Sequence, residues 1–231
     1  MRGLIWGYHV GRGLERAFAA LLSVFAAVSA AQAAPEIYEY RVVHSIYGEI
    51  GRYSNTVERR GDETEVRSEL HISVRILGIP AYRQDAHRTE RWRGQQLVSF
   101  DGATVTNGER LEIHGEARDN GFAITTPTGT ILAPATVHPS NPWCAMVLKA
   151  DFTMSTRTGQ LFRSTTNGGD LQSVALEGKT LLLHQYEIVS DKHEFVWLDD
   201  RGVPVAFRTE EGHHQINFIL SGRDAVVAGF R

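Results

Sequence analysis

The sequence predicts an all-β protein: a single antiparallel meander of about a dozen strands that forms a barrel or a deeply wrapped sheet. Three observations predict it: alternating polarity, turn signals at nearly regular intervals, and only one short helical segment, near residues 142–150. The composition, with 42% hydrophobic and 22% charged residues, is that of a globular chain and excludes collagen-like and disordered classes. Because Cys144 is the only cysteine, an internal disulfide framework is excluded as well.

Alternating polarity is clearest in residues 66–76. Two sets of side chains alternate there: Val66, Ser68, Leu70, Ile72, Val74 and Ile76 against Arg67, Glu69, His71, Ser73 and Arg75. Because successive side chains of a strand point to opposite faces, one face meets a core and the other meets water. That division is typical of antiparallel sheets, whereas parallel sheets are buried on both faces. Residues 38–46 and 214–220 follow the same pattern.

Turn signals separate the predicted strands. They are Gly48, Arg60-Gly61-Asp62, Leu77-Gly78, Arg93-Gly94, Asn107-Gly108, Asp119-Asn120-Gly121 and Asp200-Arg201-Gly202. Asn107-Gly108 is the strongest hairpin signal, because both residues tolerate the positive φ angles of a type I′ turn. Helical character is limited to residues 142–150, where Pro142 can occupy the first turn of a short helix.

The first 33 residues have the pattern of a cleavable secretory signal. Arg12 and Arg16 precede an apolar run from Ala17 to Val28, and an Ala31-Gln32-Ala33 triplet follows. The run has about twelve residues, fewer than the roughly 20 that cross a bilayer as a helix, which favours a cut near Ala33. An uncleaved amphipathic anchor is the alternative interpretation.

Removal of residues 1–33 leaves a mildly acidic chain. Its 21 basic and 26 acidic side chains give a formal charge of −5, so nucleic acid is not an expected partner. No later stretch of 18 apolar residues follows, and we expect no transmembrane segment after processing. No linker, repeat or charge block divides residues 36–231, which predicts a single all-β domain. Export and this charge together predict a periplasmic or secreted location.

Nine histidines follow residue 33, and their density raises the question of a metal site. His213 and His214 are adjacent on a predicted strand, so they point to opposite faces and cannot share one ion. The other histidines lack the spacing of a ligand pair, and we expect no metal and no cofactor. If a metal did bind, His71, His87 or His184 from neighbouring strands would be its candidate ligands.

Glu90 is the most notable acidic residue. It shares one strand face with Tyr82, Arg88 and Trp92. An acid on an aromatic face is either a ligand contact or an ion-paired core residue, and Arg88 favours the ion pair. Asp199 and Asp200 precede a glycine turn and predict hairpin chemistry rather than one half of a catalytic carboxylate pair.

Residues 134–143 form the one irregular stretch that stands out. The segment contains Pro134, Pro139 and Pro142, three of the seven prolines, so it has few accessible conformations. Such a loop can hold His138, Asn141 and Trp143 at low entropic cost for recognition. The alternative is a lid that closes one end of the barrel, with Trp143 as its apolar plug.

Several short motifs occur in an order that resembles a known group. They are Tyr38-x-Tyr40, Gly48-x-x-Gly51, Glu90-x-Trp92 with Gly94 and Leu97, Asn107-Gly108, Pro139-Ser140-Asn141-Pro142-Trp143 and Val196-Trp197-x-Asp199-x-x-Gly202. The chain is similar to an uncharacterised exported family of small Gram-negative periplasmic proteins, a domain-of-unknown-function group with a wrapped antiparallel β-sheet. The resemblance implies fold and compartment, but no reaction and no catalytic residues.

Two functional hypotheses follow. The first is a periplasmic binding or envelope-assembly module whose curved sheet holds an apolar or glycan ligand, with an envelope protein as a further partner. Its candidate ligand contacts are aromatic side chains and nearby polar groups: Tyr82, Glu90, Trp92, His138, Asn141, Trp143, Tyr186 and Trp197. The alternative is a hydrolase or lyase acting on an envelope polysaccharide or lipid, with Glu90, His138 or Asp199 as acid or base.

Overall fold

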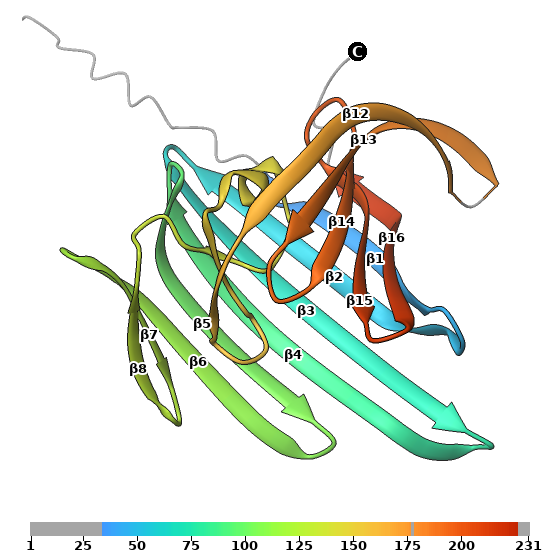
Figure 1. Cartoon of the computed structure of the whole chain (residues 1–231), viewed down its shortest axis with the longest axis horizontal. Helices are drawn as coiled ribbons and strands as arrows, with labels where there is room; N and C mark the ends of the chain where they lie inside the picture. The colour runs from blue at the N-terminus through green and yellow to red at the C-terminus, as the bar shows by residue number, and fades with distance from the viewer. Residues whose placement is uncertain (1–33, 177, 226–231) are drawn as a thin grey trace, which may run out of the picture. The chain divides into compact units, whose positions relative to one another are not determined.

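The computed structural model describes residues 34–176 and 178–225, and β-strands dominate this part of the chain (Figure 1). The first eight strands are β1 (Glu36–His44), β2 (Gly48–Arg60), β3 (Glu63–Ile76), β4 (Ile79–Arg93), β5 (Gln96–Thr106), β6 (Glu109–Arg118), β7 (Gly121–Thr126) and β8 (Gly129–Ala133). Three short strands follow, β9 (His138–Pro139), β10 (Phe152–Met154) and β11 (Leu161–Arg163). The last five are β12 (Thr165–Leu176), β13 (Lys179–Val189), β14 (His193–Leu198), β15 (Pro204–Glu211) and β16 (His214–Ala225).

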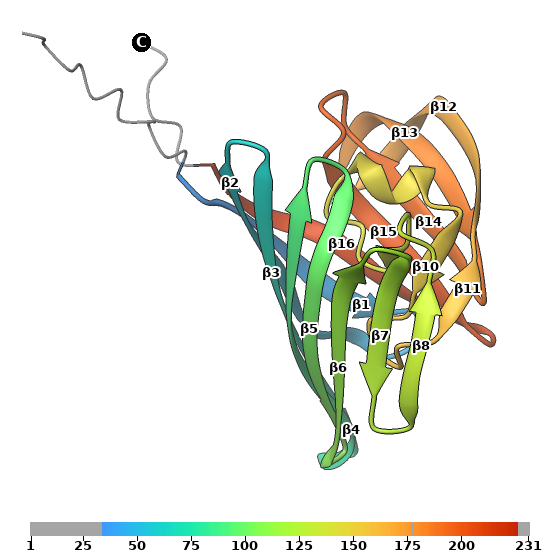
Figure 2. The ribbon, with the colours of Figure 1, turned by 90° about the vertical axis from the view of Figure 1, so that its left-hand side faces the viewer.

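Thirteen strands form one antiparallel sheet in the order β12-β13-β14-β15-β16-β1-β2-β3-β4-β5-β6-β7-β8. Two series of hairpins therefore meet in the middle of the sheet, where β16 pairs with β1 and Phe218 lies opposite Val42. Figures 1 and 2 show these two series as the two sides of one bent sheet. The predicted all-β class and the wrapped antiparallel sheet are confirmed; the sheet stays open, with β8 and β12 as its edges, and does not close into a barrel.

A small second sheet departs from the predicted single meander. β9 pairs in parallel with β10, and β10 pairs antiparallel with β11. Pro134, Pro139 and Pro142 lie in or beside the segment that leads into this sheet, and each removes a backbone donor that a continuing hairpin ladder would use. The small sheet is drawn between the two sides of the large one (Figure 2).

The side-chain pattern of β3 confirms the predicted division of faces. Val66, Ser68, Leu70, Ile72 and Val74 are buried, and the residues between them are exposed. Within β3 the face prediction is wrong only at Ile76, which is 46% exposed because it ends the strand beside the turn to β4. In the other two runs it is wrong at Ile46, which is 62% exposed in the turn after β1, and at His214, which is exposed at the start of β16. The predicted turn at residues 107–108 is also confirmed, with φ angles of 50° and 92°.

The predicted helix near residues 142–150 is shorter than expected. It is a five-residue 3-10 helix, η1 (Ala145–Lys149). The Cys144 sulfur accepts a hydrogen bond from the Met146 backbone N–H at 3.4 Å and caps the start of the helix. Pro142 and Trp143 therefore lie before the helix, in irregular backbone. Val147 is buried and fixes η1 against Ile188, Val196 and Leu198.

The predicted signal segment, residues 1–33, and its cut site lie outside the described residues. In the described ranges, no helix has both the length and the apolar character needed to cross a membrane.

Candidate functional site

Glu90 lies at the centre of a buried hydrogen-bond network. Its side chain is completely buried, on the inner face of β4. Trp92 Nε1 and Trp143 Nε1 donate to Glu90 Oε2 at 3.0 Å and 3.1 Å, and Asn141 Nδ2 donates to Oε1 at 2.7 Å. Four of the eight predicted site residues therefore meet at one carboxyl group.

The predicted ion pair between Glu90 and Arg88 is wrong. Among the described residues, no nitrogen of Arg88 lies within salt-bridge distance of a carboxylate, and Glu90 is held by neutral donors instead. Burial raises the pKa of Glu90 to about 7, whereas the hydrogen bonds from Asn141, Trp92 and Trp143 and the Arg88 charge act in the opposite direction.

The network continues onto β2 and β3. Asn141 Nδ2 also donates to Ser68 Oγ at 2.9 Å, and Ser68 Oγ donates to Asn55 Oδ1 at 2.7 Å. The Tyr53 hydroxyl lies within hydrogen-bond distance of the side-chain oxygens of Asn55 and Asn141, and burial raises its pKa to about 12. The segment 134–143 is thus anchored to the large sheet by polar groups that are almost all satisfied.

No ligand fits among the aromatic members of this network. The rings of His138 and Trp92 meet edge to face at 4.9 Å, and Trp92 and Trp143 at 6.1 Å. The space that they enclose is about 10 Å³, which is at or below the minimum for one water molecule. Burial lowers the pKa of His138. This geometry favours the lid interpretation of the loop, with Trp143 as its plug.

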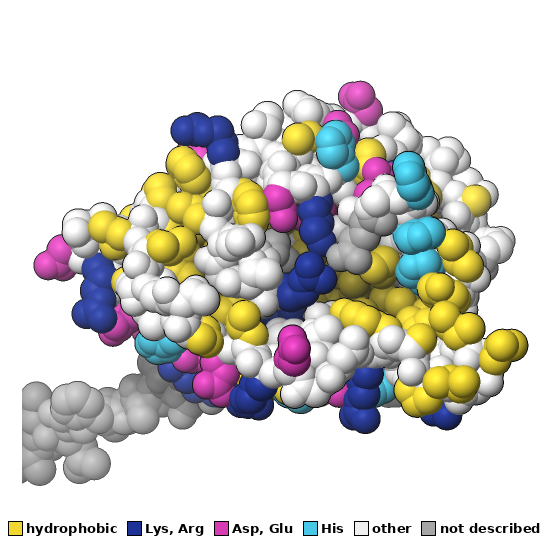
Figure 3. Space-filling model, turned by 60° about the horizontal axis from the view of Figure 1, so that its bottom comes forward, with side chains coloured by type: hydrophobic (Ala, Val, Ile, Leu, Met, Phe, Trp, Pro, Cys, Tyr) yellow, Lys and Arg dark blue, Asp and Glu magenta, His cyan; other side chains and the backbone are white. Residues whose placement is uncertain are grey.

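A larger cavity of about 230 Å³ borders Asn141 on the inner side of the bent sheet. Its apolar walls come from both hairpin series and from the small sheet: Leu70, Ile72, Phe162, Val196, Phe207, Ile216 and Phe218. The rings of Phe207 and Phe218 stack at 4.3 Å. Figure 3 shows a hollowed face in which hydrophobic side chains lie beside Lys and Arg side chains.

Polar groups occupy defined positions in the same cavity. Arg88 lines it from β4, and Thr153 and Thr209 line it from β10 and β15. The hydroxyl groups of both threonines are buried and have no hydrogen-bond partner. Glu194 lines the cavity from β14, and burial raises its pKa to about 7. This cavity is the candidate functional site.

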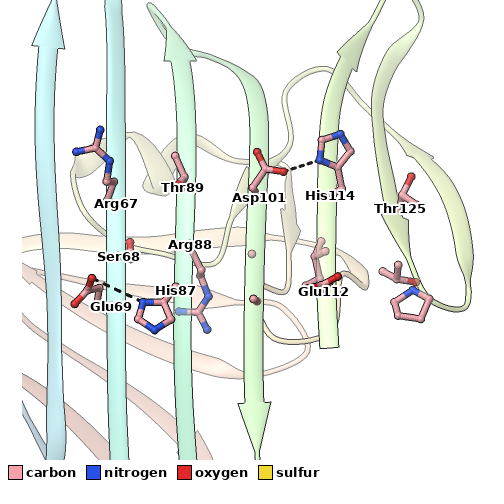
Figure 4. A pocket seen from close by; sticks show the side chains of 15 residues that line it. Arg67, Ser68, Glu69, His87, Arg88, Thr89, Asp101, Glu112, His114 and Thr125 are labelled. Atoms are coloured by element: carbon pink, nitrogen blue, oxygen red, sulfur yellow. Dashed lines mark hydrogen bonds and ion pairs between the residues drawn. The ribbon is translucent and has the colours of Figure 1, made fainter. Parts of the chain in front are cut away.

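A second, wider hollow of about 700 Å³ lies on the exposed face of β3 to β7 (Figure 4). Its polar side chains already contact one another across neighbouring strands. His114 Nδ1 lies 2.6 Å from Asp101 Oδ1, and His87 Nδ1 lies 3.8 Å from Glu69 Oε1. Because this hollow is open and its charges are paired, it offers less to a ligand than the inner cavity.

The other predicted contacts lie apart from the cavity lining. Tyr82 packs against the core opposite Val74, and Tyr186 packs against the cluster around η1. Trp197 lies on the sheet face opposite Val196, where its Nε1 donates to Gln185 at 3.2 Å. These three side chains therefore do not join the candidate site.

The predicted acid–base groups do not converge. Asp199 Oδ1 accepts hydrogen bonds from the backbone N–H groups of Arg201 and Val203, which confirms the hairpin interpretation. Neither Asp199 nor His138 is hydrogen-bonded to Glu90 in the described part of the chain. The described residues also contain no group of three or more His, Cys, Asp or Glu side chains arranged to hold a metal.

Several cavity residues were not predicted as contacts. Tyr53 and Arg88 lie on inward faces of β2 and β4, and Phe207 and Phe218 on β15 and β16. The alternation that placed Ile72 inward could have placed Arg88 inward as well. A charged residue at an inward position of a strand, such as Arg88, is the sequence signal that indicates a cavity contact.

Known proteins share sequence or fold with this chain. A family model described as a domain of unknown function, DUF6134, matches residues 40–221. A β-barrel-like DUF1849 protein from Brucella abortus aligns with a TM-score of 0.62 and 12% identity over 84% of this chain and 98% of that one. A DUF1089 family protein from Pseudomonas aeruginosa aligns with a TM-score of 0.34 and 12% identity, over 66% and 87% of the two chains. No curated protein matches the chain.

Proposed function

We propose that this chain, which belongs to the DUF6134 family, is an exported binding protein that holds a small, largely apolar ligand inside its bent sheet. The observation that carries the proposal is the cavity of about 230 Å³ between β2–β4 and β14–β16. Small-molecule sites are concave, with apolar walls and a few placed polar groups, and this cavity offers both.

The wall chemistry favours an apolar ligand over a glycan. Phe207, Phe218 and Ile216 give one wall, and Leu70 and Ile72 give another. A glycan needs exposed aromatic faces, whereas Trp92 and Trp143 are buried in the core and use their indole N–H groups there. An envelope-assembly role follows if the ligand or its carrier belongs to the cell envelope.

The alternative hydrolase or lyase has weaker support. Glu90 is completely buried, and its two carboxylate oxygens accept three hydrogen bonds from core residues. A general acid must reach a substrate, and no described route brings one to this carboxyl group.

The proposal is tested by titrating the purified chain with N-phenyl-1-naphthylamine, a neutral probe whose fluorescence rises in apolar surroundings. We expect saturable binding to the wild type and at least about tenfold weaker binding to Ile216→Trp, because the added ring fills the cavity. Ile219→Trp is the matched control, since Ile219 lies on the opposite face of β16 and should leave binding unchanged. Equal binding by both variants, or none by the wild type, would contradict the proposal.

A further inference from the structure

Arg88 is a buried cation without a carboxylate partner. Its side chain is only 8% exposed on the inner face of β4, and burial lowers its pKa. The described structure gives the guanidinium one hydrogen bond, from Nε to the Thr156 carbonyl at 3.3 Å, and no ion pair. An isolated charge is costly to bury, so its environment must supply a compensating group.

Glu90 attracts Arg88 through space but does not bind its guanidinium directly. Glu90 lies two residues further along the same strand face, but its oxygens accept hydrogen bonds from Trp92, Trp143 and Asn141. Across the cavity, Asp191 and Glu194 form no ion pair with Arg88. Besides Arg88, the described lining contains Arg157 and Lys192 together with these two acids, whereas the guanidinium of Arg208 lies over the Phe195 ring and 3.9 Å from Glu210. The cavity is therefore suited to a negative ligand.

Two unused hydroxyl groups add an independent observation. Thr153 Oγ1 and Thr209 Oγ1 are buried, line the cavity and have no hydrogen-bond partner. Thr153 is only 5% exposed. A buried hydroxyl without a hydrogen-bond partner is destabilising. Hydroxyl donors and a guanidinium that line one cavity are groups that can bind an oxyanion.

Gly102, on the strand beside Arg88, leaves room for the ring of Phe100. It lies opposite Arg88 in the register of β4 and β5. A Cβ atom at this position would lie 2.8 Å from Phe100 Cε1 and 3.7 Å from Arg88 Cγ. The absent side chain lets Phe100 pack beside the stem of Arg88 and thereby helps to fix its course along the sheet.

We propose that the ligand is a medium-length alkyl chain with one oxyanion head group, carboxylate or phosphate, and that Arg88 binds this head group. The inference rests on the proposed binding function and names its ligand class. The cavity of about 230 Å³ is small, so we choose chains of eight carbons as test ligands. The apolar walls formed by Ile72, Phe207 and Phe218 take the chain.

The test compares eight-carbon ligands by calorimetry: octanoate, octyl phosphate, 1-octanol and octyltrimethylammonium. For the wild type we expect at least one of the two anions to bind tenfold or more tightly than 1-octanol, and the cation to bind most weakly. Arg88→Met should remove this advantage of the anion, and Arg88→Lys should restore part of it. Arg91→Met is the control, because Arg91 lies on the exposed face of the same strand, paired with Glu65. The preferred anion separates a carboxylate from a phosphate head group.

If Arg88 stabilised the fold and bound no ligand, Arg88→Met would be less stable than the wild type. The ligand-binding role predicts the opposite. Replacing a buried charge with an apolar side chain of similar volume is often neutral or stabilising, so Arg88→Met should unfold at an equal or higher temperature than the wild type. If 1-octanol binds as tightly as both anions, or if Arg88→Met keeps the wild-type ratio, the inference is wrong and the apolar cavity still stands. If the wild type binds none of the four compounds and no N-phenyl-1-naphthylamine, both proposals fail.

Discussion

At the scale of single residues, Glu90 couples the lid segment to the large sheet. One carboxyl group receives Asn141 and Trp143 from the segment 134–143 and Trp92 from its own strand. The pKa of Glu90 is about 7 in the folded state, above the ordinary value of 4.5. Between pH 4.5 and about 7, folded Glu90 therefore keeps its proton while Glu90 of the unfolded chain has lost it. Stability from this group is complete below pH 4.5 and is lost as the pH rises to about 7.

Glu90→Gln should remove this pH dependence. The difference between 4.5 and about 7 corresponds to roughly 3 kcal/mol at the most. In the Gln side chain an NH2 group replaces one carboxyl oxygen and faces the N–H donors of Asn141, Trp92 and Trp143. The variant should therefore be less stable than the wild type at pH 5, by about 1–3 kcal/mol. Urea unfolding at pH 5, 6, 7 and 8 measures both effects, and the stability gap to the wild type should narrow as the pH rises.

The comparison between variants isolates Glu90 from other titrating groups. Glu194 has a pKa raised in the same direction, and His138, whose pKa is lowered by burial, acts in the opposite direction below its ordinary 6.5. Both remain in Glu90→Gln and cancel in the difference. Glu109→Gln, at an exposed position of β6, is the control and should follow the wild type at every pH. Parallel stability curves for the wild type and Glu90→Gln would show that Glu90 does not titrate in this range.

At the scale of the elements, β3 has an inner and an outer face that should respond differently to substitution. Ile72→Asp places a carboxylate at a 5% exposed position without a partner, and we expect a loss of at least about 3 kcal/mol or failure to fold. Arg75→Ser removes only two exposed hydrogen bonds, both to the Gly78 carbonyl, and we expect a loss of about 1 kcal/mol or less. Thermal unfolding of both variants checks this, and equal losses would contradict the assigned faces.

The elements also show how far sequence reasoning reaches. Alternation and turn chemistry are local, so the inner face of β3 and the turn at Asn107 were predictable from a few neighbouring residues. The partners of Glu90 were not, because Asn141 and Trp143 lie about fifty positions away and no period relates them to β4. Arg88 was predicted as the partner of Glu90 because both lie on one face. Only the packed structure shows that neutral donors occupy that carboxylate.

At the scale of the whole described chain, the pairing of β16 with β1 holds the two hairpin series together. It places Phe218 beside Tyr53 and Phe207, and Tyr40 donates from β1 to the Pro204 carbonyl at 2.9 Å. The cavity exists only because these distant segments meet, so its volume and lining depend on how strongly the sheet bends. The strand pattern predicts that the sheet wraps but not how far it bends, which is why the lining of the cavity could not be predicted.

The same central position of β1 gives the export hypothesis a structural condition. β1 begins at Glu36 and pairs on both sides, with Val57 of β2 and with Ala225 of β16. A cut after Ala33 leaves every one of these pairs intact, whereas a cut a few residues later would remove ladder hydrogen bonds from the middle of the sheet. The expected signal and the start of the strand are therefore compatible.

Expression of the full chain in a Gram-negative host tests this condition. The intact mass of the periplasmic protein should correspond to a chain that starts at residue 34. Ala33→Tyr should block processing, because signal cleavage needs a small side chain there, and Gln32→Tyr is the control at the tolerant middle position of the triplet. A full-length product that stays in the membrane fraction would support the uncleaved anchor instead. A full-length product in the cytoplasm would refute export, while the cavity and its ligand class would remain to be judged by binding alone.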